Sequence, residues 1–125
     1  MANINYNDLA MDIYNFCREN EMWDGVVIYF DGKALASWNE WGGECGTKIG
    51  ESLYLYTNKR AGDYLEYINP DGLSCAFDGS FGLHTLVNDW GATFPSTYEI
   101  FCNIFNKYGL YFELGCSWYL TTAEL

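Results

Sequence analysis

The feature that most constrains this chain is an apolar run that ends at an Asp-Gly pair. Residues 26–30 read Val-Val-Ile-Tyr-Phe, a β-branched and aromatic stretch typical of a buried strand. Asp31 and Gly32 follow at once, and this dipeptide favours the type I′ turn that joins two antiparallel strands with the correct twist. The sequence therefore predicts a hairpin in which residues 33–38 pair back on residues 26–30.

Further strands are expected later in the chain. Within residues 52–57 leucines alternate with tyrosines, so one face of that strand is aliphatic and the other carries tyrosines. Residues 69–72 read Asn-Pro-Asp-Gly, which suits a tight turn and predicts a second hairpin between residues 64–68 and 73–77. A last strand is expected at about residues 110–120, with a glycine that marks a bulge or bend.

Three segments are predicted to be helical. Apolar residues recur at helical spacing in residues 6–20 and, over a shorter stretch, in residues 83–90. Asn5 stands where it would cap the first of these helices. Another helix is expected after Pro95, where Ser96 and Glu99 have the spacing of a capping box.

The order of these elements predicts one α+β domain over residues 1–125. Strands and helices do not alternate regularly, as a parallel α/β sheet would require. We expect a mostly antiparallel sheet of about five strands built from hairpins. The N-terminal and C-terminal amphipathic helices would pack on one face of this sheet and bury their apolar stripes.

The chain is strongly acidic. It has 17 Asp and Glu residues against 6 Lys and Arg, a net charge of −11 at pH 7. This charge disfavours direct binding to nucleic acid or to anionic lipid, and no apolar stretch is long enough to span a membrane. A basic protein is the expected partner. The acidic residues chosen as candidates for binding it, on the first helix and just beyond, are Asp8, Asp12, Glu19, Glu21 and Asp24.

Aromatic residues are unusually numerous. Five Trp, eleven Tyr and eight Phe exceed what a core of this size needs beside its Leu, Ile and Val. Some rings are therefore expected at the surface, where Tyr and Trp are common in recognition sites. An equally weighted interpretation is that the tyrosines are half-buried at the edge of the core.

Residues 37–44 form the most distinctive local pattern, because they combine Trp38, Glu40, Trp41 and Glu44 with two glycines. One interpretation is an acidic recognition loop anchored by the two rings, and the other is a Trp buried at a strand end. A third possibility is a sugar stacked on the rings, with the two glutamates as acid and base. The first interpretation adds these four residues to the candidate partner-binding set.

Two other patterns bear on chemistry. Residues 42–50 are rich in glycine, but Thr47 precedes Lys48 instead of following it, so this is not a phosphate loop and an inter-strand loop is expected. Cys45 and His84 would make a nucleophile pair if the fold brings them together. No His and Cys residues have the spacing of metal ligands, so neither a metal nor a cofactor is expected.

The leading hypothesis is a non-enzymatic inhibitor or immunity-type protein that blocks a basic site on a partner, such as a nucleic-acid-binding channel. Five cysteines without paired spacing, and an N-terminus without a signal pattern, favour the cytoplasm. One alternative is a small enzyme that uses Cys45 with His84, or Glu40 with Glu44, on a polar substrate. Another is a subunit of a homo-oligomer or larger assembly, with the surplus rings buried in an interface.

Overall fold

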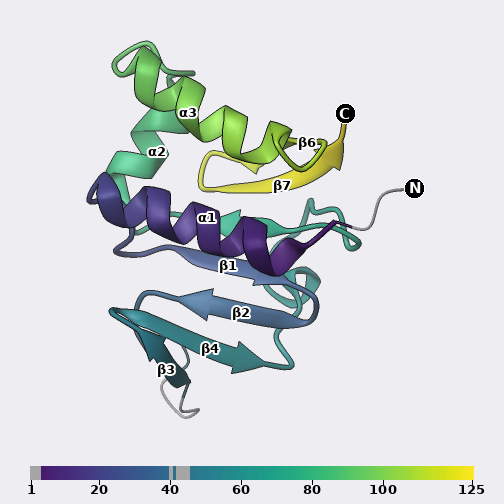
Figure 1. The fold of residues 1–125 in the computed structure, drawn as a ribbon. Coiled ribbons are helices and arrows are strands. Elements are labelled where there is room, and N and C mark those ends of the chain that lie inside the picture. The colour runs from purple at the N-terminus through teal and green to yellow at the C-terminus, as the bar shows by residue number, and fades with distance from the viewer. Residues whose placement is uncertain (1–3, 40, 42–45) are drawn as a thin grey trace.

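Figure 1 shows the computed structural model of the chain, which describes residues 4–39, 41 and 46–125. In this part of the chain, three α-helices, seven strands and one 3₁₀ turn occur. In chain order they are α1 (Tyr6–Glu19), β1 (Val27–Phe30), β2 (Lys33–Ala36), β3 (Thr47–Gly50), β4 (Leu53–Thr57), η1 (Ala61–Asp63), β5 (Ser74–Ala76), α2 (Phe81–Asn88), α3 (Pro95–Asn106), β6 (Leu110–Cys116) and β7 (Tyr119–Glu124). The predicted α+β class is confirmed, but the sheet has seven strands and not five.

The strands form one antiparallel sheet in the order β3-β4-β2-β1-β5-β7-β6. The predicted hairpin at its centre is confirmed, since Val27 of β1 pairs with Ala36 of β2. Both turn residues have the positive φ that a type I′ turn needs, 50° at Asp31 and 73° at Gly32.

The second predicted hairpin is wrong. β5 forms within residues 73–77, but it pairs with β1 and β7, and residues 64–68 contain no strand. The cause lies in the preceding turn, where the amides of Tyr64 and Leu65 both donate to the carbonyl of Ala61, at 3.0 and 2.7 Å. This turn curls the chain away from an extended conformation, so β5 is left to pair with strands distant in sequence.

Two strands replace the single last strand expected at residues 110–120. β6 and β7 pair as a hairpin, and their register shifts between Leu114 and Cys116. The predicted irregularity at Gly115 is therefore present as a bulge. It lies inside the hairpin, close to the turn that joins the two strands.

Two local predictions are also corrected. Thr47–Gly50, expected as part of a loop, forms strand β3 and pairs with β4. The capping box is absent, because α3 already begins at Pro95 and its N-cap residue Phe94 makes no side-chain capping bond. Ser96 consequently lies inside the first turn, where the fixed φ of proline favours an early helix start.

The larger hydrophobic core lies between the sheet and the helices. All three helices contribute to it, together with the strand residues that point toward them. Its fully buried side chains include Leu9, Ile13, Ile28, Leu83, Leu86, Phe101 and Phe105. Because successive strand residues point to opposite faces, the other face of the sheet needs a separate cover.

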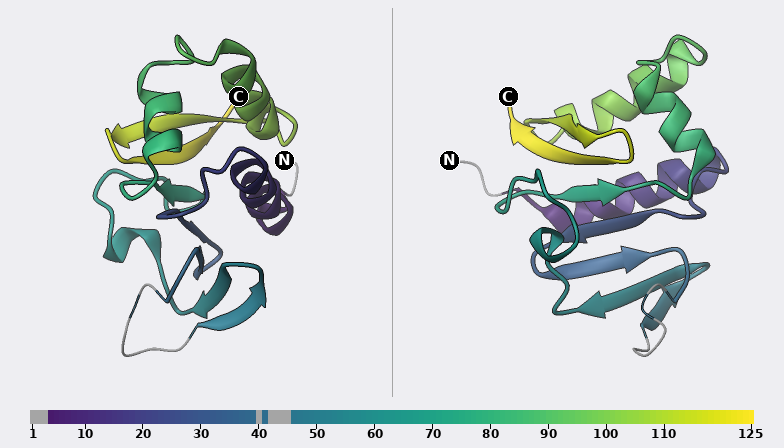
Figure 2. Two further views of the ribbon diagram at one scale, coloured as in Figure 1. Left: turned by 90° about the vertical axis from the view of Figure 1, so that its left-hand side faces the viewer. Right: turned by 180° about the vertical axis from the view of Figure 1, so that it is seen from behind.

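An irregular segment supplies that cover. Residues 58–73 with the turn η1 lie on the side of the sheet opposite α1 (Figure 2, left). Beneath them the rings of Tyr29 and Tyr64 stack with centroids 5.7 Å apart, and Trp41 meets Tyr56 edge-on at 4.7 Å. Part of the aromatic surplus therefore builds a second, smaller core.

Candidate functional site

Four chain segments meet at the end of the sheet where β1 begins, on the left in Figure 1. The turn before β1 contacts the segment after β2, because the amide of Gly25 donates to Ser37 Oγ at 3.0 Å. The same turn contacts the one after β5, where a side chain at Gly25 would collide with the backbone of Gly79. Gly25 also has a φ of 84°, so both its space and its conformation require glycine.

Further hydrogen bonds complete this end of the sheet. Ser80 Oγ donates to the carbonyl of Met22 at 2.5 Å and accepts the amide of Leu83 at 3.3 Å, which caps α2. The amide of Phe77 donates to the carbonyl of Trp118 at 2.8 Å. The four segments are thus held side by side in the order of their strands, β2, β1, β5 and β7.

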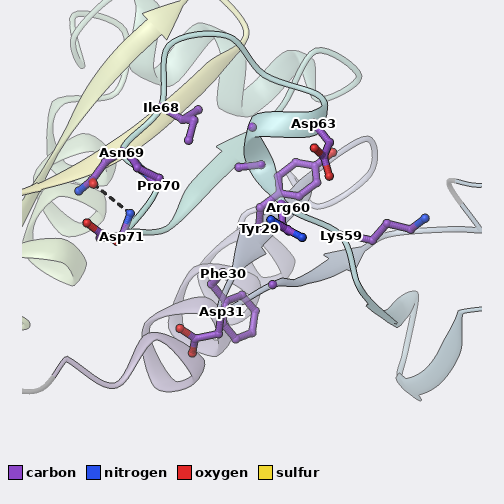
Figure 3. A pocket seen from close by; sticks show the side chains of 14 residues that line it. Tyr29, Phe30, Asp31, Lys59, Arg60, Asp63, Ile68, Asn69, Pro70 and Asp71 are labelled. Carbon is purple, nitrogen blue, oxygen red and sulfur yellow. Dashed lines mark hydrogen bonds between the residues drawn. The ribbon is translucent and has the colours of Figure 1, made fainter.

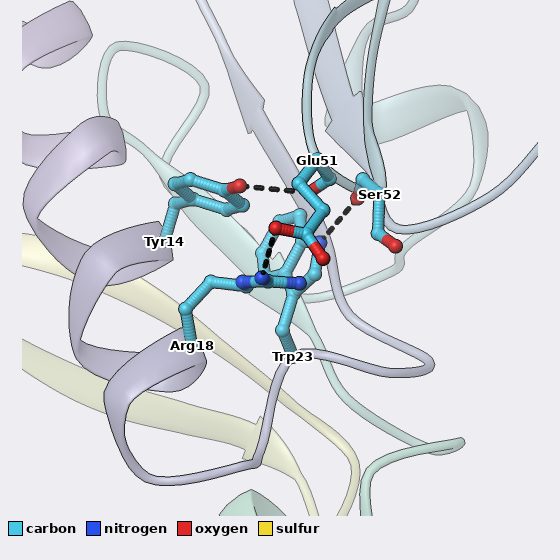
Figure 4. Close-up of polar contacts among 5 residues, drawn as sticks. All are labelled: Tyr14, Arg18, Trp23, Glu51 and Ser52. Atoms are coloured by element: carbon cyan, nitrogen blue, oxygen red, sulfur yellow. Dashed lines mark hydrogen bonds and ion pairs between the residues drawn. The ribbon is translucent and has the colours of Figure 1, made fainter.

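The C-terminal part of α1 is anchored next to them (Figure 4). Tyr14 donates its hydroxyl hydrogen to the carbonyl of Glu51 at 2.7 Å, and Trp23 Nε1 donates to the carbonyl of Ser52 at 2.5 Å. The guanidinium of Arg18 pairs with the Glu51 carboxylate at 2.8 Å. These contacts tie the β3–β4 turn to the helix and to the loop that follows it.

Several of the side chains that this end of the sheet exposes to solvent are acidic or aromatic. Phe81 is 86% exposed, Trp38 55% and Trp118 37%, and the side chains of Asp24 and Asp78 are also exposed. We call these five side chains the turn face. The short segments that carry them contain no Lys or Arg. Exposed rings and carboxylates on adjoining turns are suited to a cationic protein surface.

The acidic residues predicted on and after α1 do not all have the same environment. Exposed side chains are found at Asp8, Glu19, Glu21 and Asp24. Asp12 is different, because its carboxylate accepts the hydroxyl hydrogen of Tyr108 at 2.5 Å and pairs with the ammonium of Lys107 at 2.7 Å. It therefore connects α1 to the end of α3.

The electrostatics of Asp12 agree with this connecting role. Burial alone would raise the pKa of its carboxyl group, but the hydrogen bonds from Lys107 and Tyr108 and the charge of Lys107 outweigh burial and lower that pKa. Burial, the hydrogen bond to Asp12 and nearby negative charge raise the pKa of Tyr108. The negative charge of the ionised Asp12 carboxylate is thus already balanced within the chain by Lys107.

The structure separates the two tryptophans of the predicted loop. Trp38 is exposed on the turn face, whereas Trp41 packs on the other face of the sheet, where Lys59 Nζ lies 4.8 Å from its ring centroid. Glu40 and Glu44 lie outside the described residues. One ring is therefore available to a partner and the other belongs to the second core.

The predicted Cys45–His84 pair lies only partly within the residues that the structure describes. Cys45 lies outside them, and His84 is half-buried on α2 with its ring centroid 6.3 Å from that of Phe77. Cys17 and Cys75 are fully buried. Burial raises the pKa of Cys17 to about 12 and that of Cys75 well above its usual value. Both thiols stay protonated and have no access to a substrate.

A cleft of about 560 Å³ opens at the opposite end of the sheet (Figure 3). The β1–β2 turn and the segments Lys59–Asp63 and Ile68–Gly72 line it. Its charged side chains are Asp31, Asp63, Asp71, Arg60 and Lys59, and Lys59 extends away from the carboxylates in Figure 3. Neither His nor Cys is among the lining residues.

Within residues 4–39, 41 and 46–125, no group of three or more His, Cys, Asp and Glu side chains is placed to hold a metal ion. None of the helices described there has the length and apolar character needed to cross a membrane. Comparisons with protein-family models, curated proteins and solved structures find no match to this chain.

Sequence reasoning missed three residues of the turn face, Asp78, Phe81 and Trp118. A signal was present, since Asp24 and Asp78 are both followed by glycine and both adjoin a short buried strand. Those two turns meet because β1 and β5 are neighbours. Because residues 73–77 were expected to pair with residues 64–68, the pairing of β1 with β5 was not predicted.

Proposed function

We propose that this domain is a small acidic inhibitor or immunity-type protein, which binds a basic site on another protein and covers it. The observation that supports this most directly is the exposure of its negative charge. Among the residues that the structure describes, every Asp and Glu side chain except Asp12 and Asp89 is exposed. A surface of this kind attracts a basic partner over several ångströms and accelerates their association.

The few cations of the chain do little to offset that charge. Arg18 and Lys107 are engaged in ion pairs with Glu51 and Asp12. Lys59 is only 6% exposed and lies over the ring of Trp41. The field around the molecule is therefore mainly negative, which repels phosphate groups and favours a partner that itself binds nucleic acid.

Exposed rings supply the short-range part of the proposed interaction. Charge on its own mainly determines the rate and specificity of association, whereas buried aromatic side chains carry much of the affinity in protein interfaces. Phe81 and Trp38 are among the most exposed aromatic side chains of the molecule. Both belong to the turn face, which also has two exposed carboxylates. Charge would guide the partner to the surface and the rings would hold it there.

The first experiment is an affinity capture of the tagged protein from its source cells at low and moderate salt, with nuclease present. A basic protein that salt releases is expected, and its nucleic-acid binding should be lost when the purified domain is added in equal amount. The proposal is overturned if the captured protein keeps its activity when saturated with the domain. It is also overturned if no basic protein is captured.

A matched pair of charge reversals tests the role of the α1 end. Changing Glu19, Glu21 and Asp24 to Lys should slow association with the captured partner about tenfold at low salt, and less at higher salt, because salt screens steering. The control changes three exposed acidic residues elsewhere, Asp63→Lys, Glu66→Lys and Asp71→Lys. Equal slowing by both variants would show that net charge alone matters.

A further inference from the structure

Resting on the function proposed above, we propose that the turn face holds the partner by its arginine side chains. The turn face consists of Asp24, Trp38, Asp78, Phe81 and Trp118, as defined above. Its carboxylates and its exposed rings come from adjoining segments, so one guanidinium group can reach both. The turn face would therefore prefer arginine to lysine, in addition to preferring positive charge.

The first carboxylate and ring come from neighbouring turns. Asp24 directly precedes Gly25, whose amide is bonded to Ser37 Oγ at 3.0 Å, and Trp38 directly follows Ser37. The hydrogen bond therefore holds the two segments together one residue away from each functional side chain. A group bound to the Asp24 carboxylate lies next to the segment that carries the indole.

The second carboxylate and ring share a single turn. Asp78 and Phe81 are separated by Gly79 and Ser80. Ser80 is buried and bonded to Met22 on one side and to the start of α2 on the other. The turn is thus fixed at its centre, and the two exposed side chains extend from its two ends.

This combination of groups distinguishes arginine from lysine. The guanidinium group is planar and weakly hydrated, so it can stack on a ring and at the same time donate two hydrogen bonds to a carboxylate. The ammonium group of lysine is compact and strongly hydrated, and it gains less from an exposed ring. Rings beside carboxylates therefore favour arginine, whereas carboxylates alone would bind both cations similarly.

The occupant that fits this surface is a basic protein and not a second copy of this chain. The chain has two arginines, Arg18 and Arg60, and Arg18 already pairs with Glu51. Among the residues that the structure describes, Arg60 makes no ion pair with an acidic side chain. A second copy would therefore present only this arginine to a face with two carboxylates and three rings. A basic partner offers several arginines, and the fixed backbone of the turn face loses little entropy when it binds them.

The test uses two synthetic peptides of equal length, an arginine–glycine repeat and a lysine–glycine repeat. Binding to the purified domain is followed by tryptophan fluorescence and by calorimetry at low salt. We expect the arginine peptide to bind about three- to tenfold more tightly than the lysine peptide, from one or two exposed cation–π contacts. Equal affinity for the two peptides, or no binding of the arginine peptide, overturns the inference.

Two variants separate the contributions of rings and carboxylates. In the double variant Trp38→Ala, Phe81→Ala, the affinity for the arginine peptide should fall to that for the lysine peptide. In Asp24→Asn, Asp78→Asn, both affinities and their salt dependence should fall. The matched controls are Trp90→Ala, which removes a ring that is 75% exposed elsewhere, and Asp63→Asn, Asp71→Asn at the cleft. Controls that weaken binding as much as the turn-face variants contradict the inference.

The partner captured in the first experiment distinguishes failure of this inference from failure of the proposed function. If the Trp38→Ala, Phe81→Ala variant inhibits that partner with unchanged affinity, the turn face is not the contact surface and the inhibitory function stands. If the unaltered domain inhibits no basic partner, the proposed function fails whatever the peptides show. If the variant loses inhibition while its thermal unfolding is unchanged, both proposals are supported.

Discussion

The two faces of the sheet are covered in different ways. On one face, three helices bury aliphatic and phenylalanine side chains, and Phe101 and Phe105 lose all exposure. On the other, an irregular segment covers tyrosines and a tryptophan whose polar atoms keep partners, as where Tyr56 donates its hydroxyl hydrogen to Asn39 at 3.1 Å. The first core consists mainly of aliphatic and phenylalanine side chains, with Tyr14 and Trp23 among its members, and the second core is richer in tyrosine.

This difference explains much of the aromatic content. Tyrosine combines a large apolar ring with a hydroxyl group that needs a partner, so it suits a face that remains close to water. Aromatic rings that are buried in the second core are not available for contact with another molecule. The proposed interaction would use the smaller set of aromatic rings that belong to neither core, such as Phe81 and Trp38.

The helix-covered face should be the more sensitive to loss of a side chain. Phe101 is fully buried, and its ring centroid lies 5.1 Å from those of Phe16 and Phe105 and 5.4 Å from that of Phe112. Phe101→Ala should lower the free energy of unfolding by about 3–5 kcal/mol, because it opens a cavity that rigid neighbours cannot fill. Urea denaturation measures this value directly.

The loop-covered face should respond less to an equivalent change. Leu65 is 5% exposed within the second core. Leu65→Ala is expected to cost about 2 kcal/mol, at the low end for a buried leucine, since the irregular segment above it can relax into the space. Hydrogen exchange should show residues 58–73 opening before the helices do.

Leu86→Ala is the matched control, because Leu86 is fully buried on the helix-covered face. It should cost about 3 kcal/mol or more. If Leu65→Ala costs as much as Leu86→Ala, or if all amides exchange together, the two faces form one equally rigid core and the contrast drawn here is wrong.

A smaller effect should come from the polar contact that joins the covering helices. Asp12 accepts the hydroxyl hydrogen of Tyr108 at 2.5 Å, and both groups remain partly accessible. A double-mutant cycle with Asp12→Ala and Tyr108→Phe should give a coupling energy of about 1 kcal/mol, typical of a hydrogen bond to a charged group that solvent can reach. A coupling near zero would show that this hydrogen bond contributes nothing, and would leave the Asp12–Lys107 ion pair and apolar packing as the links between α1 and the end of α3.

The same contact should make stability depend on pH in a definite direction. The pKa of Asp12 is lower in the folded protein than its ordinary value, so folding favours the ionised form. The stabilisation is fully present at neutral pH and is lost as the pH falls below about 4. The difference in urea midpoint between the unaltered protein and Asp12→Ala should therefore shrink between pH 7 and pH 3. A difference that stays constant would contradict this assignment.

The parts of the fold that local signals determine were predictable. The Asp31-Gly32 turn, the leucine–tyrosine alternation of β4 and the capping of α1 by Asn5 all agree with the structure. Errors arose where pairing joins strands distant in sequence. β5 contacts β7 from the far end of the chain, and no turn signal specifies such a partner, because the register depends on which faces are buried.

The candidate site shows the same limit. Exposed carboxylates on α1 followed from helical spacing, and Asp8 and Glu19 are exposed as expected. Sequence alone could not show that Asp12 is engaged by Lys107, because Asp12 lies on α1 and Lys107 directly follows α3, far away in the chain. It also could not bring the turn before α2 against the turn before β1, since that contact depends on β1 and β5 being neighbours.

The smallest expected effect concerns the rings that belong to neither face. Phe81→Ala and Trp38→Ala should each change the free energy of unfolding by less than about 0.5 kcal/mol, because the removed atoms are already in contact with water. Urea midpoints at neutral pH measure this. A large loss of stability in either variant would mean that the ring supports the turns beneath it. Unchanged stability would mean that these two rings are not needed for folding, which is what the proposed contact with a partner requires of them.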